Sequence, residues 1–168
     1  HRSTNVLFIT KEYKEYSQGA VLQYELPLNA RIEKKKGEAI KLDDVIATFR
    51  SKFAGKIKNI QVVSDEQQNK YFEIIVENDA KVFTDAEKEK LKFEPESKYI
   101  IPRRVRTFIE GEEVSAVTIP VERVVKPEQV IAADEVLAKI INNSRFNDYL
   151  HGFVEFAEIS DIVEFSII

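Results

Sequence analysis

Two stretches of the chain repeat the same order of landmarks, and this repeat limits the fold more than any other feature. One copy spans Tyr24–Ile60 and the other spans Val117–Ile159. Each contains a strand-like segment that enters a proline, a second apolar segment, a charged turn, an acidic turn, and then Val-Ile-Ala or Val-Leu-Ala. Each copy closes with a glycine that opens another apolar segment. Such a repeat predicts a fold assembled from two similar β-rich modules.

The second copy also admits a helical interpretation. Its segment VVKPEQVIAADEVLAKI places Pro127 where a helix can begin, and Glu, Gln and Ala follow. The counterpart in the first copy, IEKKKGEAIKLDDVIATF, has a more strand-like composition. We therefore expect extended strands at Val130–Ala133 and Val136–Ile140, separated by a turn at Asp134–Glu135. A continuous helix across these residues would contradict the repeat.

The rest of the chain is dominated by strand signals. Segments rich in β-branched and aromatic residues lie at Asn5–Thr10, Ala20–Pro27, Lys70–Asn78 and Gly152–Ile168. In contrast, TDAEKEKLKF at Thr84–Phe93 combines an N-capping residue, a glutamate three residues later and a lysine-rich end. This pattern predicts a short helix.

These signals predict a mostly β protein with two small barrel-like modules joined by a short helical segment. Within each repeat, a small alanine allows close approach of the strands, while its larger neighbour fills the interior. The neighbours are Ile46 and Ala47 in the first copy, and Leu137 and Ala138 in the second. The expected organisation is an N-terminal strand or linker at 1–19, modules at 20–83 and 97–168, and a helical linker at 84–96.

Composition excludes several chemistries. The chain has 168 residues and a net charge of −4, so it offers no general electrostatic case for binding nucleic acid or membrane. It has no cysteine, which excludes disulfides, thiolate metal sites and a cysteine nucleophile, and it fits a cytoplasmic location. The sequence has no run of about 20 apolar residues, the length that spans a bilayer.

No catalytic centre is evident from the residues. The two histidines are His1 and His151, and a lone histidine beside a strand is typical of a structural or solvated position. Adjacent carboxylates at Asp43–Asp44, Glu112–Glu113 and Asp134–Glu135 fall in expected turns, where acidic residues hydrogen-bond the backbone. No phosphate-binding, dinucleotide-binding or metal-ligand spacing occurs. We therefore expect no catalytic residue, no metal and no cofactor.

The repeat resembles the sandwich-barrel hybrid motif, and in particular the copies inserted in the β′ subunit of bacterial RNA polymerase. The residues that carry the resemblance are YELPLNARIEKKKGEAIKLDDVIATF and NDYLHGFVEFAEI, with IPRRVRTFIEGEEVSAVTIP similar to the strands between copies. The resemblance covers roughly residues 20–62 and 97–160. It implies a non-catalytic inserted domain that modulates elongation or pausing. The implied partners are the trigger loop, other polymerase subunits and transcription factors.

Two alternatives stay open. One is a stand-alone β-rich binding or adaptor domain. The other is a carrier domain of the biotinyl or lipoyl type, for which Lys52 in RSKFAG is the nearest candidate lysine. Its neighbours match neither the Met-Lys-Met nor the Asp-Lys-Ala pattern of those domains.

Basic residues give the candidate contact surface. The segment Arg31–Lys58 holds nine basic and four acidic residues, and PRRVR at 102–106 is a second basic group. Such residues either form a solvated surface or contact a nucleic-acid backbone or an acidic protein face. The candidate contact residues are Lys34, Lys35, Lys36, Arg50, Lys52, Lys56, Lys58, Arg103, Arg104 and Arg106.

Overall fold

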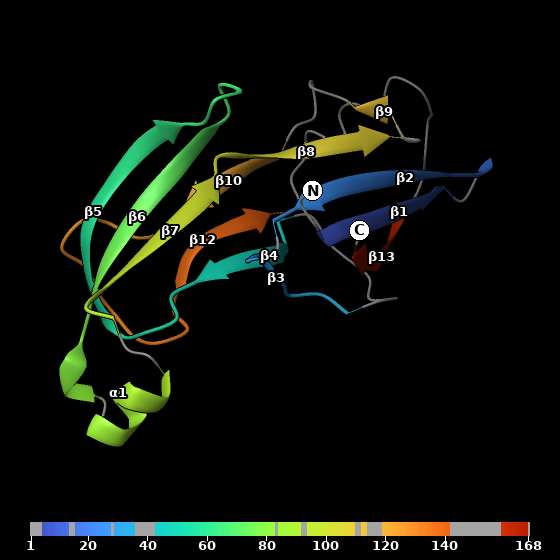
Figure 1. The fold of residues 1–168 in the computed structure, drawn as a ribbon. Coiled ribbons are helices and arrows are strands. Elements are labelled where there is room, and N and C mark those ends of the chain that lie inside the picture. The colour runs from blue at the N-terminus through green and yellow to red at the C-terminus, as the bar shows by residue number, and fades with distance from the viewer. Residues whose placement is uncertain are drawn as a thin grey trace. The chain divides into compact units, whose positions relative to one another are not determined.

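Most of the described chain is β-structure in the computed structural model (Figure 1). The structure describes residues 5–13, 16–27, 29–35, 43–82, 84–91, 94–109, 112–113, 119–141 and 159–167. The helical elements in these ranges are a 3-10 turn at Ala80–Val82 and the helix α1 at Asp85–Leu91. The mostly β fold and the short helix after Thr84 are therefore confirmed. No helix in the described residues is long and apolar enough for a membrane crossing.

Contacts divide the chain into two compact units, and each combines separate segments. The first unit comprises residues 1–48, 104–121 and 139–168, and the second comprises residues 49–103 and 122–138. The structure contains two curled sheets that form half-barrels. Each unit also takes segments from more than one of the ranges expected from the sequence, and the boundaries at 20–83, 84–96 and 97–168 stay predictions.

The larger sheet takes most of its strand residues from the first unit. Its strand order is β13-β1-β2-β8-β10-β12-β4-β3, with β9 paired to β8. The strands are β1 Asn5–Tyr13, β2 Tyr16–Leu26, β3 Arg31–Ile32, β4 Val45–Arg50, β8 Arg104–Ile109, β9 Glu112–Glu113, β10 Ile119–Arg123, β12 Val136–Ile141 and β13 Ile159–Ile167. The apolar final segment thus pairs with β1 along its described length, as its β-prone composition predicts. Glu112–Glu113 form a short strand instead of the expected turn.

The second unit contains a four-stranded antiparallel sheet in the order β11-β5-β6-β7. Its strands are β5 Gly55–Ser64, β6 Lys70–Asn78, β7 Glu96–Pro102 and the short β11 Val130–Ile131. A β-bulge lies between Ile57 and Asn59 of β5, so Lys58 is the additional residue in that strand. Gly55 opens β5, as the repeat predicts.

The repeat is present in the backbone, with a constant displacement of 91 residues. The amide of Glu33 donates to the carbonyl of Ile46 at 2.9 Å, and the amide of Val124 donates to the carbonyl of Leu137 at 2.9 Å. Subtracting 33 from 124 or 46 from 137 gives the same displacement. The sheet order β10-β12-β4-β3 places the equivalent strands symmetrically, because β12 corresponds to β4 and the end of β10 corresponds to β3. The two copies therefore share one register.

Both copies use an aspartate at the same turn position. Asp43 and Asp134 have positive φ angles of 66° and 69°, which few residues other than glycine adopt readily. Each lies two residues before the start of the buried strand of its copy, β4 or β12. Aspartate tolerates this conformation better than most side chains, which explains the acidic turns noted in the sequence.

The helical interpretation of residues 124–140 is wrong. Strands β11 and β12 are extended, as expected, although β11 ends at Ile131 and not at Ala133. The turn between them is centred on Ala133–Asp134, one residue before the expected position. Pro127 occupies the second position of a tight turn, where the amide of Gln129 donates to the carbonyl of Lys126 at 3.2 Å. Glu128 has a φ of 71°, so the turn has the pattern of type II. Gly37, at the equivalent place in the first copy, lies outside the described residues.

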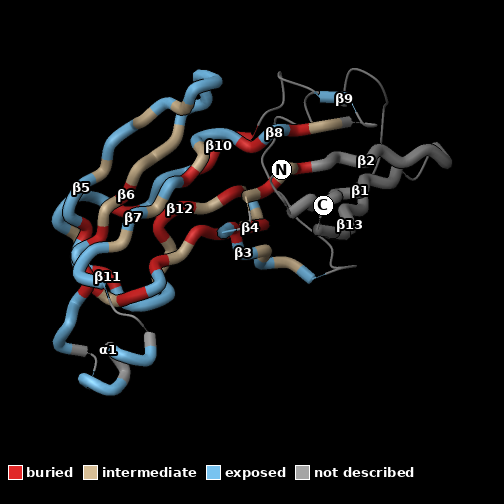
Figure 2. Tube along the Cα trace, viewed as in Figure 1, coloured by how far each residue is buried: buried red, intermediate tan, exposed pale blue. Residues whose placement is uncertain are grey.

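The buried side chains follow the repeat. Ile46, Ala47, Leu137 and Ala138 are all fully buried, which confirms their predicted interior positions. Figure 2 shows buried stretches along β4 and β12, and exposed stretches around the turn between β5 and β6. The sequence landmarks therefore mark the core of each copy.

Candidate functional site

The strands β5, β6 and β7 have two faces of different chemistry. Residues that pair across antiparallel strands project to the same face, and neighbours along a strand project to opposite faces. Glu73 pairs with Gln61 and Ile100, whereas Phe72 pairs with Val62 and Ile101. The register therefore assigns each paired residue of these strands to one face or the other.

The first face carries all the acidic residues of these strands and is called the carboxylate face below. It includes Lys56, Gln61, Glu73, Glu77, Glu96, Lys98 and Ile100. Glu73 accepts a hydrogen bond from the amide group of Gln61 at 2.8 Å and pairs with Lys98 at 3.2 Å. These two donors lower the pKa of Glu73. The face is thus internally neutralised to a large extent.

Two predicted contact lysines are held in ion pairs beside this network. Lys56 pairs with Glu128 at 2.7 Å, and Lys58, on the bulge, pairs with Glu96. Hydrogen bonding to the partner carboxylate and its negative charge raise the pKa of each lysine. A carboxylate beside each ammonium group opposes the approach of a phosphate. The structure therefore weakens the nucleic-acid interpretation at Lys56 and Lys58.

The opposite face is called the carboxylate-free face. Among the described residues of β5, β6 and β7, no Asp or Glu projects to it. It is buried at one end, where Ile57, Ile74 and Val76 have no exposed surface. Towards the β5–β6 turn it becomes exposed, and Val62 keeps 52% of its surface accessible.

The exposed end of this face forms a small group that we call the distal patch, consisting of Val62, Lys70, Phe72 and Arg103. Val62 and Phe72 pair directly across the strands. Arg103 follows β7, and its guanidinium carbon lies 5.5 Å from the centroid of the Phe72 ring. Its amide donates to the carbonyl of Lys70 at 3.2 Å, which holds the two basic residues close together. The patch thus combines apolar surface with two cations.

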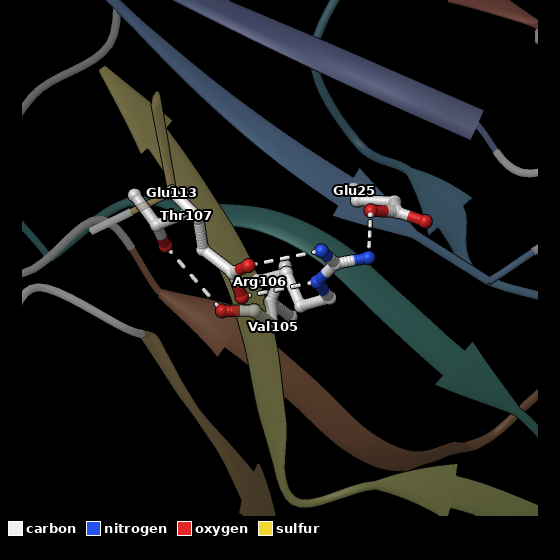
Figure 3. Close-up of polar contacts among 5 residues, drawn as sticks. All are labelled: Glu25, Val105, Arg106, Thr107 and Glu113. Carbon is white, nitrogen blue, oxygen red and sulfur yellow. Dashed lines mark hydrogen bonds and ion pairs between the residues drawn. The ribbon is translucent and has the colours of Figure 1, made fainter. Parts of the chain in front are cut away.

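Arg106, from the first unit, forms the densest ion-pair group among the predicted residues (Figure 3). Its guanidinium contacts Glu113 through two nitrogens at 3.1 and 3.0 Å, and Glu25 at 3.1 Å. It also lies 5.2 Å from the ring of Phe108. Both carboxylates occupy the donors that a phosphate would need. Arg106 therefore joins β2, β8 and β9 and is a poor candidate for nucleic-acid contact.

We expect Arg106→Gln to raise the pKa of Glu113. Hydrogen bonding from Arg106 lowers that pKa most, desolvation opposes the effect, and the guanidinium charge lowers the pKa further. A carboxyl with a lowered folded pKa stabilises the protein above its unfolded pKa and loses this contribution as pH falls through the folded value. NMR titration of the side-chain carboxyl measures the shift.

Arg104→Gln, an exposed neighbour on the same strand, is the matched control and leaves the pKa of Glu113 unchanged. An equal shift in both variants would contradict the assignment to Arg106. The free energy of unfolding changes little in either case, because the ion pairs are largely exposed.

The remaining predicted residues are dispersed. Lys34 pairs with Asp44 at 3.1 Å, and Arg50 donates to the carbonyl of Asp134 at 2.9 Å. Lys35 and Arg104 are exposed, and Lys36 lies outside the described residues. Lys52 is exposed, with its ammonium 5.5 Å from the ring of Phe53 and its amide bonded to the hydroxyl of Tyr99 at 2.8 Å. The ten candidates do not form one basic surface within either unit.

Sequence reasoning missed Lys70, Phe72 and Val62, which accompany Arg103. The signal was available in KYFEIIVEN, where alternation places Lys70 and Phe72 on one face and Tyr71 and Glu73 on the other. Among the described residues, no cluster of three or more His, Asp or Glu side chains has the arrangement of a metal site. His151 lies outside the described residues.

Comparison with known proteins finds no family model, no curated protein and no solved structure that matches the chain. Fold and site together define an all-β protein with an internal repeat and a small cationic, apolar patch.

Proposed function

We propose that this chain is a non-catalytic inserted domain of the bacterial RNA polymerase β′ subunit. In this role it modulates transcription elongation and pausing in the cytoplasm through contacts with the trigger loop, neighbouring subunits or transcription factors. The domain acts through its contact surfaces and its place in the subunit, and nucleotide addition takes place elsewhere in the polymerase.

The observation that carries the proposal is the shared register of the two copies. The resemblance to the polymerase insertions rests on the order of landmarks that the two copies share, and on the segments YELPLNARIEKKKGEAIKLDDVIATF, NDYLHGFVEFAEI and IPRRVRTFIEGEEVSAVTIP. Equivalent hydrogen bonds at Glu33–Ile46 and Val124–Leu137 show that this order reflects a repeated backbone structure. The sequence pattern used for the resemblance is therefore not a coincidence of composition.

The arrangement of charge supports a role in contacts. Lys34, Lys56, Lys58 and Arg106 all pair with carboxylates of this chain. Such pairs shape a solvated surface and select among protein partners by their pattern of charge. The distal patch differs, because its cations lie beside exposed apolar surface.

The mechanism follows from a two-state equilibrium. A catalytic loop that folds and unfolds during each nucleotide addition changes the contacts of any domain attached to it. A domain that makes better contacts in one state shifts the loop towards that state by the difference in contact free energy. A difference of about 1 kcal/mol changes the equilibrium about fivefold. Small surface contacts are therefore sufficient for regulation.

The test replaces the domain in its host polymerase with a short Gly-Ser linker and measures pause lifetimes on a defined template. We expect pause lifetimes to change about fivefold, the effect of a coupling near 1 kcal/mol. The same polymerase carrying the domain intact is the control. Unchanged elongation and pausing would contradict the proposal. A free start and stop codon around the coding segment would instead support a stand-alone β-rich binding domain.

A further inference from the structure

We propose that the distal patch, Val62, Lys70, Phe72 and Arg103, docks an acidic, apolar-containing segment of a protein partner. The inference deepens the proposed function and rests on its premise that the domain acts through protein contacts. The proposed partner segment is defined by its chemistry alone: it carries carboxylates that alternate with large apolar side chains.

Strand pairing in the sheet brings the residues of the distal patch close together. Val62 and Phe72 are paired across β5 and β6, and Lys70 lies two residues before Phe72 on the same strand and the same face. Arg103 reaches over the Phe72 ring at 5.5 Å. A guanidinium group that contacts an aromatic face through its cation still has N–H donors available for carboxylates. The contact with Phe72 therefore holds these donors beside an exposed apolar side chain.

Charge complementarity identifies the partner as acidic. Glu73, Glu77 and Glu96 all project to the carboxylate face, so Lys70 is the one charged side chain that the described residues of the three strands place on the carboxylate-free face. The nearby Asp65 binds the amides of Gln67 and Asn69 within the β5–β6 turn, at 2.9 and 2.8 Å. An acidic segment meets two cations at the distal patch, whereas on the opposite face Glu73 and Glu96 already pair with lysines of this chain.

The patch favours a protein segment over a nucleic acid. Stacking of bases requires an open aromatic face, and Arg103 lies over the ring of Phe72. Tight binding to a phosphate backbone requires several cations at once. The two lysines of this sheet that the sequence predicted as contacts, Lys56 and Lys58, are paired with carboxylates. Aromatic, arginine and exposed aliphatic side chains together are typical of protein interfaces.

The experiment titrates the isotopically labelled full chain with a synthetic acetylated dodecapeptide that alternates Glu with Leu and Phe. Chemical-shift changes are expected at Val62, Lys70, Phe72 and Arg103. The affinity is expected to fall as salt is added, because exposed charges are screened. A peptide with Lys in place of every Glu, and a single-stranded DNA of mixed sequence, serve as comparison probes and are expected to bind about tenfold more weakly or not at all.

Matched variants test which face of the sheet binds the acidic peptide. The double variant Lys70→Gln/Arg103→Gln removes both cations of the patch and is expected to weaken the acidic peptide about tenfold. Val62→Gln, on the same face, is expected to weaken it several-fold. The controls are Lys98→Gln and Ile100→Gln on the carboxylate face, where Ile100 has a similar exposure of 41%. These controls are expected to leave the affinity unchanged.

Three results would overturn the inference: no binding of the acidic peptide, tighter binding of the DNA than of the acidic peptide, or an equal loss of affinity in the controls and the patch variants. A two-dimensional amide spectrum of each variant verifies that the fold is retained. Because these measurements use the chain alone, their outcome does not depend on the outcome of the polymerase test. Peptide binding at the patch with unchanged pausing would refute the polymerase role and leave the docking site intact.

Discussion

Gly55→Ala is expected to destabilise the protein by about 3 kcal/mol and to lower its Tm by roughly 10 °C. Gly55 lies between Ile131 of β11 and Asn78 of β6 at the start of β5. A Cβ at this position would overlap the carbonyl oxygen of Glu77, 3.0 Å from its carbonyl carbon and 3.1 Å from the Cα of Asn78. Because these are backbone atoms, β5 and β6 must separate to admit the methyl group.

The control for this prediction is Ser64→Ala, which places the same side chain at an exposed position of the same strand. Urea denaturation followed by circular dichroism gives the free energy of unfolding of each variant. Hydrogen exchange should also show reduced protection at the amides of β6 in Gly55→Ala. An unfolding midpoint equal to that of the parent would show that the strands shift without cost and would refute the steric argument.

The parts of the fold that the sequence predicted depend on local chemistry. The acidic turns before β4 and β12 were recognisable because aspartate tolerates positive φ, and the buried Val-Ile-Ala and Val-Leu-Ala segments follow directly. Pro127 favoured the helical interpretation, which was wrong, because proline suits the second position of a tight turn as well as the first turn of a helix. Comparison with the first copy resolved the ambiguity, since Gly37 stands at the turn position that Glu128 occupies.

Long-range pairing was not predictable from one sequence. Lys56 and Glu128 are far apart in the chain and meet only because β11 pairs with β5. The basic segment Arg31–Lys58 was interpreted either as a solvated surface or as a contact surface. Its residues belong to two compact units, and Lys56 and Lys58 pair with acidic residues far away in the sequence. Local counts of charge carry no information on such partners. The candidate site therefore changed more than the fold did.

The bulge in β5 had a further effect on the candidate site. Simple alternation assigns alternate residues to one face, but the extra residue at Lys58 reverses the assignment for the rest of β5. Without the bulge, simple alternation would place Val62 on the same face as Lys56, and Gln61 on the same face as Ile57. The observed register instead pairs Val62 with Phe72, which creates the distal patch. A bulge has no reliable sequence signal, and the patch was therefore recognised only from the structure.

Leu137→Ala and Ile46→Ala are each expected to cost about 2–5 kcal/mol, the range for truncation of a buried aliphatic side chain. The two residues occupy equivalent places in the repeat, and both are fully buried. Equivalent positions in one shared register predict losses of similar size. Val130→Ala, at a position that keeps 77% of its surface exposed, is the control and should change the free energy of unfolding by less than about 0.5 kcal/mol.

Denaturant unfolding of the three variants tests the repeat as an energetic unit. If the repeat defines the core of each copy, both buried truncations lower the unfolding midpoint strongly while the exposed truncation does not. A large loss at Leu137 with almost none at Ile46 would show that the two copies share backbone register without sharing a role in stability. The functional proposal would then lose its main structural support, because it depends on two copies of one folded unit. Similar losses would instead tie the repeated residues, which carry the resemblance, to the packing that holds each copy together.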